Sequence, residues 1–536
     1  MTMLSRAEPA RYRVWLALIV LGGLAARLLH VSVALGSDDQ VWIKVAREIS
    51  AHAVHTDEPV YYTRLVWTWI LILWGLLGSL SLEWTAVLMF VLSGLTTVFI
   101  AEGTRTAFDT RSALLAAVVY AAHPLAITFD AYTLPDGLAV CMLAACIWRF
   151  LHYLRTPRLT ALIVPGLLIG LLFGVKNYFM LVSLACALTM LMLPMAPRLR
   201  VTHTGALAAV AIGGLAFALL LGLVSGVDTT SHVTSAGNYV DYISRELAPG
   251  QGIESARDVV SLLVERGASL TILFFGFGTI MGLLTLFGFT FSVAQLRASP
   301  AQQFLVSMVV IFLLFLMFMP VRLSPLLFTQ LHERYLTILL PPLAISAGVA
   351  LAAMQEALVT RPLRTAAGCL FAAAVGYCLW VPNGLHDQYG RLEMRGVAQV
   401  ISAAPGHGTA TLLLPSNYRR LVPDSYRNGS VQLRFVDLRS PTGIAAALDS
   451  AEADSSIAVV AIRAPYRSLV EKLRAGDYSE DVGYGRFAML MREAGARGLV
   501  VGEVRVPYDT LRVWLARAGV ATRGQLVGWV ISRSAR

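Results

Sequence analysis

The stretch Gly36-Ser37-Asp38-Asp39-Gln40-Val41-Trp42 lies just after the first hydrophobic segment of the chain. The residues that follow it, Ile43-Lys44-Val45-Ala46-Arg47-Glu48-Ile49, have the pattern of an amphipathic helix on a membrane surface. Two adjacent carboxylates at the mouth of a membrane helix are costly, so the pair is a candidate functional site. The alternative is a helix N-terminus, because Ser37 and Asp38 are good N-cap residues. The stretch by itself fits both interpretations.

The composition indicates the class of protein. Among the 536 residues, 57% are hydrophobic and only 14% are charged, and the mean hydropathy is +0.66. These values exclude an ordinary soluble protein and predict a polytopic α-helical membrane protein. The formal net charge of +10 is therefore interpreted as a feature of membrane topology rather than of nucleic-acid binding.

The N-terminal region predicts a retained signal anchor. Arg6, Arg11 and Arg13 are followed by an apolar run without a small-residue cleavage pattern after it. The five cysteines lie inside apolar segments, without metal-ligand spacing, and we expect them to be packing residues with no disulfide framework. They are Cys141, Cys146, Cys186, Cys369 and Cys378.

Apolar segments predict about eleven membrane-spanning helices, because each segment is close to the ~17–25 residues that a bilayer requires. The segments lie near residues 13–34, 84–101, 112–129, 137–153, 159–175, 177–195, 205–225, 268–292, 303–320, 335–353 and 365–382.

A further apolar run at 64–80 is ambiguous, and the basic residues decide it. If the N-terminus is cytoplasmic and this run does not span, the basic connectors all lie on the cytoplasmic side, as the positive-inside rule requires. If the run spans, every one of them lies outside. We therefore expect 64–80 to be an interfacial helix that pairs with the preceding amphipathic tract. The connectors are Arg105/Arg111, Arg149/Arg155/Arg158, Arg198/Arg200, Arg297 and Arg361/Arg364.

This topology gathers four charged stretches on the non-cytoplasmic face and places the C-terminus there too. The stretches are Asp38/Asp39, the loop from Asp130 to Asp136, the segment 226–266, and His332-Glu333-Arg334-Tyr335. We expect Asp130 to lie in a solvated loop.

From about residue 383 the pattern changes to short strands that alternate with helices. This change predicts a membrane domain over 1–382 and a small extracytoplasmic α/β domain over 383–536. No nucleotide-binding loop and no catalytic Ser or Cys pattern is found there, so a lid or an acceptor-docking module is expected. Strands are predicted at 409–414, 431–438, 457–462, 487–491 and 526–532, and helices at 391–404, 441–453, 466–475 and 508–519.

Four motifs in the first ~355 residues resemble, in the same order, those of the GT-C membrane glycosyltransferases. The chain is most similar to the lipid A aminoarabinose transferases and the protein O-mannosyltransferases. Two positions depart from the family pattern: Val41 stands where Arg is frequent, and the usual Lys-Pro step is replaced by Asp57-Glu58-Pro59 and Arg64. The motifs are Asp38 to Trp42 with Val45 to Ile49, Ala122 to Leu125 with Tyr132 to Asp136, Gly170 to Lys176, and Glu333-Arg334-Tyr335 with Leu339 to Pro342.

The resemblance implies transfer of a sugar from a polyprenyl-phosphate-linked donor to an acceptor hydroxyl. The donor carries its own leaving group, so the enzyme needs a base for the acceptor and cations for the departing phosphate. Asp38 aligns with the catalytic carboxylate of the family and is expected to be the base, with Asp39 orienting the acceptor. The alternative is Asp39 as the base. Neighbouring residues on a helix point about 100° apart, so one shared role is not expected.

The remaining candidates each have a structural alternative. Asp136 either binds substrate or caps the helix that begins there, and Lys176 either binds phosphate or extends to the interface. Arg334 either pairs with its neighbour Glu333 or offers bidentate geometry to phosphate. Tyr335 and Arg64 complete the predicted substrate-binding set. No His/Asp/Glu cluster has ligand spacing, so neither a metal nor a cofactor is predicted.

The sequence therefore predicts an inverting glycosyltransferase of the cell envelope in a bacterial inner membrane. Inversion follows from a one-step displacement without a carboxylate nucleophile. The expected partners are a polyprenyl-phosphate-linked sugar, the bilayer, and an acceptor that is a lipid, a polysaccharide or a protein. The alternative is a transporter or flippase of a lipid-linked substrate. The chain has no internal repeat, and its charges collect at one face rather than at mid-bilayer, which favours the enzyme.

Overall fold

The computed structural model divides into two compact units. The first comprises Met1–Val33 and Val41–Pro382, and the second comprises Ala34–Gln40 and Asn383–Arg536. The structure describes residues 4–29, 38–52, 64–130, 132–225, 264, 267, 270, 279–318, 320–323, 326–328, 333–358, 360–380, 411–415, 432–436, 441–453, 457–463, 482–506 and 526–532.

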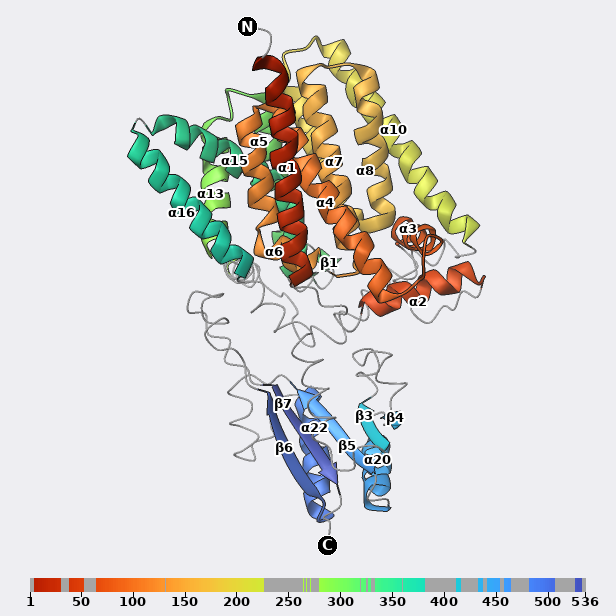
Figure 1. Ribbon diagram of the computed structural model, residues 1–536. Helices are drawn as coiled ribbons and strands as arrows, with labels where there is room; N and C mark the ends of the chain where they lie inside the picture. The colour runs from red at the N-terminus through yellow and green to blue at the C-terminus, as the bar shows by residue number, and fades with distance from the viewer. Residues whose placement is uncertain are drawn as a thin grey trace. The chain divides into compact units, whose positions relative to one another are not determined.

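The first unit is a bundle of long helices that run side by side (Figure 1). A short antiparallel ribbon of two strands, β1 (Pro320–Leu323) and β2 (Leu326–Phe328), follows α14. The helices are α1 (Leu4–Leu29), α2 (Asp38–Ser50), α3 (Leu65–Gly75), α4 (Leu82–Ala107), α5 (Thr110–Ala121), α6 (Pro124–Phe129), α7 (Pro135–Arg155), η2 (Leu159–Leu162), α8 (Ile163–Lys176), η3 (Asn177–Leu181), α9 (Val182–Met192), α10 (Pro197–Val224), α13 (Thr279–Ala294), α14 (Pro300–Phe318), η4 (Glu333–Leu339), α15 (Leu340–Ala357) and α16 (Arg361–Trp380).

Within the described part of the chain, seven helical segments are long and apolar enough to cross a membrane. Shorter apolar helices cover Leu65–Gly75, Thr110–Ala121 and Ile280–Ala294. The span predicted at 112–129 is broken because Pro124 begins a new helix, α6, with His123 as its N-cap. The two spans predicted at 159–175 and 177–195 fall on consecutive helical elements, Leu159–Met192, with a break in the backbone at Lys176. The seven segments are Trp84–Ala107, Pro135–Arg155, Leu159–Met192, Pro197–Val224, Pro300–Phe318, Arg334–Ala357 and Arg361–Leu379.

The contacts of three glycines show the relative direction of α8 and α10. Gly166, Gly170 and Gly174 of α8 lie successively against Val210, Gly214 and Ala218 of α10. Residue numbers rise in the same direction in both series, so α8 and α10 are parallel, and the chain segment that joins them, which includes α9, must return in the opposite direction. A Cβ at Gly170 would overlap backbone atoms of α10, which is the close approach that small residues permit between membrane helices.

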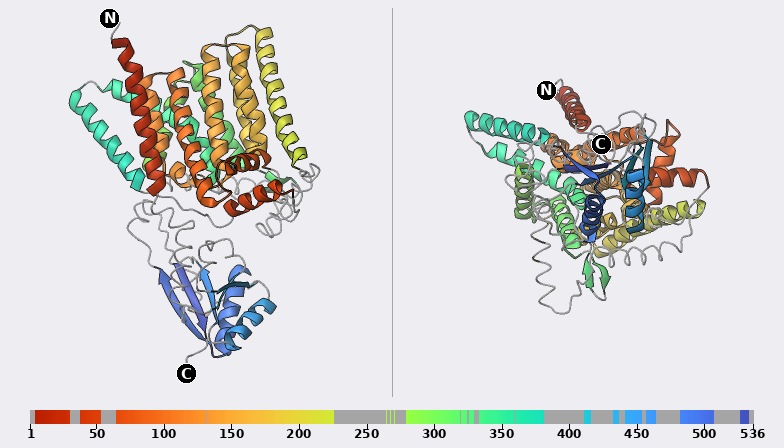
Figure 2. Two further views of the ribbon diagram at one scale, coloured as in Figure 1. Left: turned by 45° about the vertical axis from the view of Figure 1, so that its right-hand side comes forward. Right: turned by 90° about the horizontal axis from the view of Figure 1, so that it is seen from below.

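The short helices α2 and α3 lie across the ends of the long helices (Figure 1), and Figure 2 shows the same arrangement from a second direction. Val41, Val45 and Ile49 of α2 lie four residues apart and pack against Leu65 of α3. With 11 residues, α3 spans about 16 Å, which is less than the ~30 Å of a bilayer core. The structure thus confirms that the two helices pair, and their position at the membrane interface stays a prediction.

A buried ion pair joins α1 to the turn after α6. Arg27 donates to Asp130 Oδ2 through Nη2 at 2.9 Å and through Nε at 3.3 Å. The same carboxylate oxygen accepts from Ser93 Oγ at 2.7 Å and from the Tyr120 hydroxyl at 3.0 Å. The prediction of a solvated loop at Asp130 was wrong, because four donors replace its water. Asp130 holds α1, α4 and α5 together.

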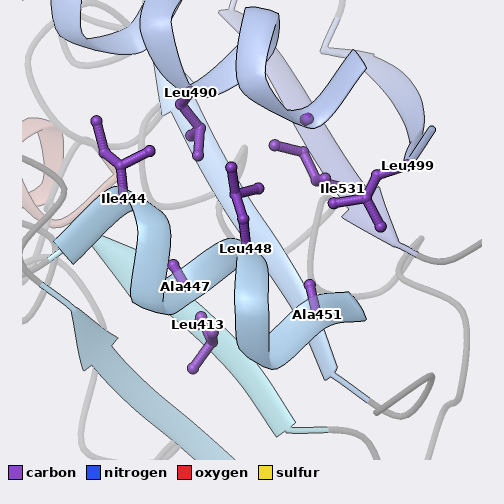
Figure 3. Close-up of a cluster of buried hydrophobic side chains, with 9 residues drawn as sticks. Leu413, Ile444, Ala447, Leu448, Ala451, Leu490, Leu499 and Ile531 are labelled. Carbon is purple, nitrogen blue, oxygen red and sulfur yellow. The ribbon is translucent and has the colours of Figure 1, made fainter. Parts of the chain in front are cut away.

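The described part of the second unit is a five-stranded sheet with the strand order β4-β3-β5-β7-β6. The first three strands are parallel, and β7 is antiparallel to both of its neighbours. Helices α20 (Pro441–Ala453) and α22 (Val482–Ala496) cover one face, as the core residues in Figure 3 show. The strands are β3 (Thr411–Pro415), β4 (Gln432–Val436), β5 (Ile457–Arg463), β6 (Val500–Val506) and β7 (Leu526–Ser532).

Most of the predicted elements of this unit that the structure describes are found. The strands predicted at 409–414, 431–438, 457–462 and 526–532 correspond to β3, β4, β5 and β7, and the helix predicted at 441–453 is α20. The strand predicted at 487–491 was wrong, because these residues lie inside α22. A short apolar run does not by itself distinguish a strand from a buried helix segment. The helices predicted at 391–404, 466–475 and 508–519 lie outside the described residues.

Candidate functional site

The candidate site lies where α7 begins and α8 ends. Asp136 is in the first turn of α7, directly after Pro135, and Lys176 is the last residue of α8. The Lys176 ammonium donates to Asp136 Oδ1, and both side chains are buried. The connection from α7 to α8 is short, so the two helices are antiparallel and these distant residues meet at one end of the bundle.

Two arginines from other elements approach this pair. Arg64 is the residue directly before α3, and Arg334 lies at the start of η4. Both guanidinium groups lie within electrostatic range of the Lys176 ammonium. The Arg334 guanidinium also lies 5.6 Å from the centre of the Tyr335 ring, a distance at which cation and ring attract.

Tyr335 and Tyr178 form the aromatic wall of the site. The Lys176 ammonium is 5.1 Å from the centre of the Tyr335 ring and 5.3 Å from that of Tyr178. The two rings meet edge to face, with centres 6.1 Å apart. Cation–π contacts of this kind hold a cation in place without neutralising its charge.

The structure therefore brings together all five residues that were predicted to bind substrate, namely Asp136, Lys176, Arg334, Tyr335 and Arg64. Asp38 and Asp39 begin α2, and their side chains lie outside what the structure describes, as does His332. Tyr178 also belongs to the site but was not predicted from the sequence. The feature that could have indicated it is its place two residues after the lysine that ends a Gly-rich apolar helix.

The arrangement is suited to an anion. Among the described side chains of the site, Arg64, Lys176 and Arg334 carry three positive charges and Asp136 one negative charge. A low-dielectric setting strengthens the attraction of such cations for a negative group. Arginine offers phosphate a planar fork and lysine a point charge. Among the described residues, no group of three His, Cys, Asp or Glu side chains could hold a metal ion.

Comparison with known proteins relates the chain to glycosyltransferases. Residues 57–221 match a family model described as Dolichyl-phosphate-mannose-protein mannosyltransferase. This segment includes Arg64, Asp136, Lys176 and Tyr178. No curated protein matches the chain.

Several solved structures are similar to the chain. The oligosaccharyltransferase of Archaeoglobus fulgidus, tethered with an acceptor peptide that contains the NVT sequon, is 15% identical over 92% of this chain and 72% of that chain, with a TM-score of 0.50. The oligosaccharyltransferase AglB of Archaeoglobus fulgidus, in complex with an inhibitory peptide and a dolichol-phosphate, is 13% identical over 77% of this chain and 63% of that chain, with a TM-score of 0.48. ArnT from Cupriavidus metallidurans bound to undecaprenyl phosphate is 12% identical over 96% of this chain and 98% of that chain, with a TM-score of 0.46.

The family match and the first of these structures agree on one class. The chain shares its fold with the first of these structures, and the resemblance to GT-C membrane glycosyltransferases that its motifs predicted is confirmed as a resemblance. A shared fold does not establish the reaction or the substrate, because one fold supports many reactions and function depends on the site.

Proposed function

We propose that this protein is a glycosyltransferase that moves a sugar from a polyprenyl-phosphate-linked donor to an acceptor hydroxyl at the cell envelope. The observation that carries the proposal is the convergence of Arg64, Lys176 and Arg334 at one end of the bundle. A phosphate group that leaves with the polyprenol develops charge as the glycosidic bond breaks, and cations held in advance stabilise that charge. The description of the matched family, which names dolichyl-phosphate-mannose, supports a donor of this kind.

In the proposed reaction, Asp38 removes the proton of the acceptor hydroxyl. The acceptor oxygen forms a bond to the anomeric carbon while the bond from that carbon to the phosphate oxygen breaks. The electron pair of the broken bond stays on the phosphate, which Arg64, Lys176 and Arg334 hold, and the proton leaves Asp38 for solvent. One displacement inverts the anomeric centre. Asp39 orients the acceptor, and the alternative exchanges the roles of the two carboxylates.

The topology proposed with this function has about eleven crossings in a bacterial inner membrane. The parallel direction of α8 and α10 supports a return of the chain across the bundle through η3 and α9 together, Asn177–Met192. The N-terminus is cytoplasmic, and the site and the C-terminal domain, 383–536, are extracytoplasmic. The second unit is proposed to act as a lid or to dock the acceptor.

Mass spectrometry of lipids that remain on the purified full-length protein tests the function. We compare the wild type with Asp38→Asn, Asp39→Asn and the control Asp449→Asn, whose side chain is exposed and paired with Arg497. An intact polyprenyl-phosphate sugar on Asp38→Asn, with bare polyprenyl phosphate on the wild type and on Asp449→Asn, supports the donor and the base. The same accumulation on Asp39→Asn alone supports the exchanged roles. The same intact glycolipid on every variant supports a transporter, and bulk phospholipid on all of them contradicts both functions.

A further inference from the structure

Tyr178 occupies an unusual position on the chain, two residues after Lys176. In a continuous α-helix, residues two apart point to nearly opposite sides, since each step turns about 100°. The backbone leaves the helical region at Lys176, with φ −157° and ψ 100°, and a new 3-10 helix starts at Asn177. This break turns both side chains toward one place, and the Lys176 ammonium lies 5.3 Å from the centre of the Tyr178 ring.

Neighbouring rings fix the Tyr178 ring. It stacks on Phe315 of α14 with ring centres 5.3 Å apart and meets the edge of Tyr335 at 6.1 Å. The Phe179 ring lies 5.1 Å away on another side. A ring that is packed in this way keeps one rotamer. Its hydroxyl is therefore aimed in a fixed direction.

The Tyr178 hydroxyl is buried and has no hydrogen-bond partner among the described residues. Buried polar groups are nearly always paired, so an orphaned hydroxyl requires an explanation. It lies within electrostatic range of Arg334, Arg64, Asp136 and Tyr335. The unpaired donor thus lies among the cations of the candidate site.

We propose that the Tyr178 hydroxyl donates a hydrogen bond to a phosphate oxygen of the lipid and so forms part of the phosphate-binding site. This inference rests on the proposed function. Phosphate oxygens are strong acceptors, and a phenol donates to them without adding charge. The lipid phosphate would thus supply the hydrogen-bond partner that the Tyr178 hydroxyl lacks among the described residues.

The test measures binding of undecaprenyl phosphate, and of undecaprenol as its phosphate-free counterpart, to the full-length protein in detergent. The variant is Tyr178→Phe, which removes only the oxygen and keeps the stacked ring. The matched control is Tyr153→Phe, because the Tyr153 hydroxyl bonds to His203 Nδ1 at 2.7 Å, outside the candidate site. Lys176→Gln reports on the cation site itself.

We expect Tyr178→Phe to raise the Kd for undecaprenyl phosphate about ten-fold or more. The Kd for undecaprenol and the Tm stay unchanged, since the hydroxyl has no partner in the described protein to lose. Tyr153→Phe keeps the wild-type Kd for undecaprenyl phosphate and lowers the Tm, because His203 loses its partner.

Three outcomes overturn the proposal. If Lys176→Gln weakens binding of undecaprenyl phosphate and Tyr178→Phe does not, the phosphate site stands and the role of Tyr178 is wrong. If Tyr178→Phe weakens binding of both lipids equally, the effect does not depend on the phosphate and the proposed hydrogen bond is wrong. If the wild type does not prefer undecaprenyl phosphate to undecaprenol, the proposed function and this inference fail together.

Discussion

Lys176 and Asp136 form a buried ion pair between the last residue of α8 and the first turn of α7. The pair stabilises the site only while both members are present. Removing one member of a buried pair leaves the charge of the other member buried without a partner, whereas neutralising both members leaves no buried charge.

Asp136→Ala is therefore expected to lower the free energy of unfolding by about 3–5 kcal/mol. The double variant Asp136→Asn with Lys176→Gln is expected to recover most of this stability. Its binding of undecaprenyl phosphate is expected to stay weaker than that of the wild type, because the lysine charge is lost. Thermal unfolding in detergent and lipid binding measure the two effects. A double variant that is as unstable as the single one contradicts this account of the pair.

The pair between Arg27 and Asp130 is expected to be structural rather than functional. Asp130→Ala leaves the Arg27 guanidinium buried, and we expect a loss of about 3–5 kcal/mol. Ser93→Ala removes only one neutral donor to the same carboxylate, for about 1 kcal/mol. Thermal unfolding of the full chain measures both. If Asp130→Ala keeps the wild-type Tm and loses transferase activity, Asp130 belongs to the reaction.

The contrast between Asp130 and Asp136 shows what the sequence can reveal. Asp130 ends one apolar helix and Asp136 begins the next, and their local sequences do not tell which cation each one meets. Arg27 lies 103 positions from Asp130 and Lys176 lies 40 positions from Asp136. Such partners are set by the tertiary fold. The pairing of α2 with α3 was predictable because the spacing of Val41, Val45 and Ile49 is a local property.

In the second unit, too, some elements could be predicted from the sequence and others could not. The helix predicted at 441–453 was found because Ile444, Ala447, Leu448 and Ala451 follow the helical period. The run at 487–491 was short and uniformly apolar, so packing against the sheet decided its structure. Tyr178 was not predicted, because the direction of its side chain depends on the backbone break at Lys176, and the residues around Lys176 do not indicate such a break.

The core of the second unit gives a separate prediction. Leu448 on α20 is fully buried between α22 and the sheet (Figure 3). Leu448→Ala is expected to cost about 2–5 kcal/mol through lost contacts and a cavity. Val500→Ala is the control, since the Val500 side chain is largely exposed. Hydrogen exchange of the full chain measures the result: faster exchange in β3, β5 and β7 is expected for Leu448→Ala alone. Equal exchange in the two variants contradicts the packing of α20.

The close contact between α8 and α10 links packing to the site. A Cβ on Gly170 would overlap the carbonyl oxygen of Ala211, whereas a Cβ on Gly213 would meet nothing within 4 Å. Gly170→Ala is therefore expected to cost about 1–3 kcal/mol by overpacking, and Gly213→Ala is expected to be neutral or to gain up to ~1 kcal/mol from helix propensity.

Because Lys176 ends the same helix as Gly170, separating α8 from α10 also displaces the ammonium from its place between Tyr178 and Tyr335. Gly170→Ala should then weaken binding of undecaprenyl phosphate as well as lower the Tm, whereas Gly213→Ala should change neither binding nor the bundle. Thermal unfolding and lipid binding on the same preparations compare the two. If Gly170→Ala lowers the Tm but binds the lipid as the wild type does, the position of Lys176 is fixed by Asp136 and the tyrosines rather than by the approach of the helices.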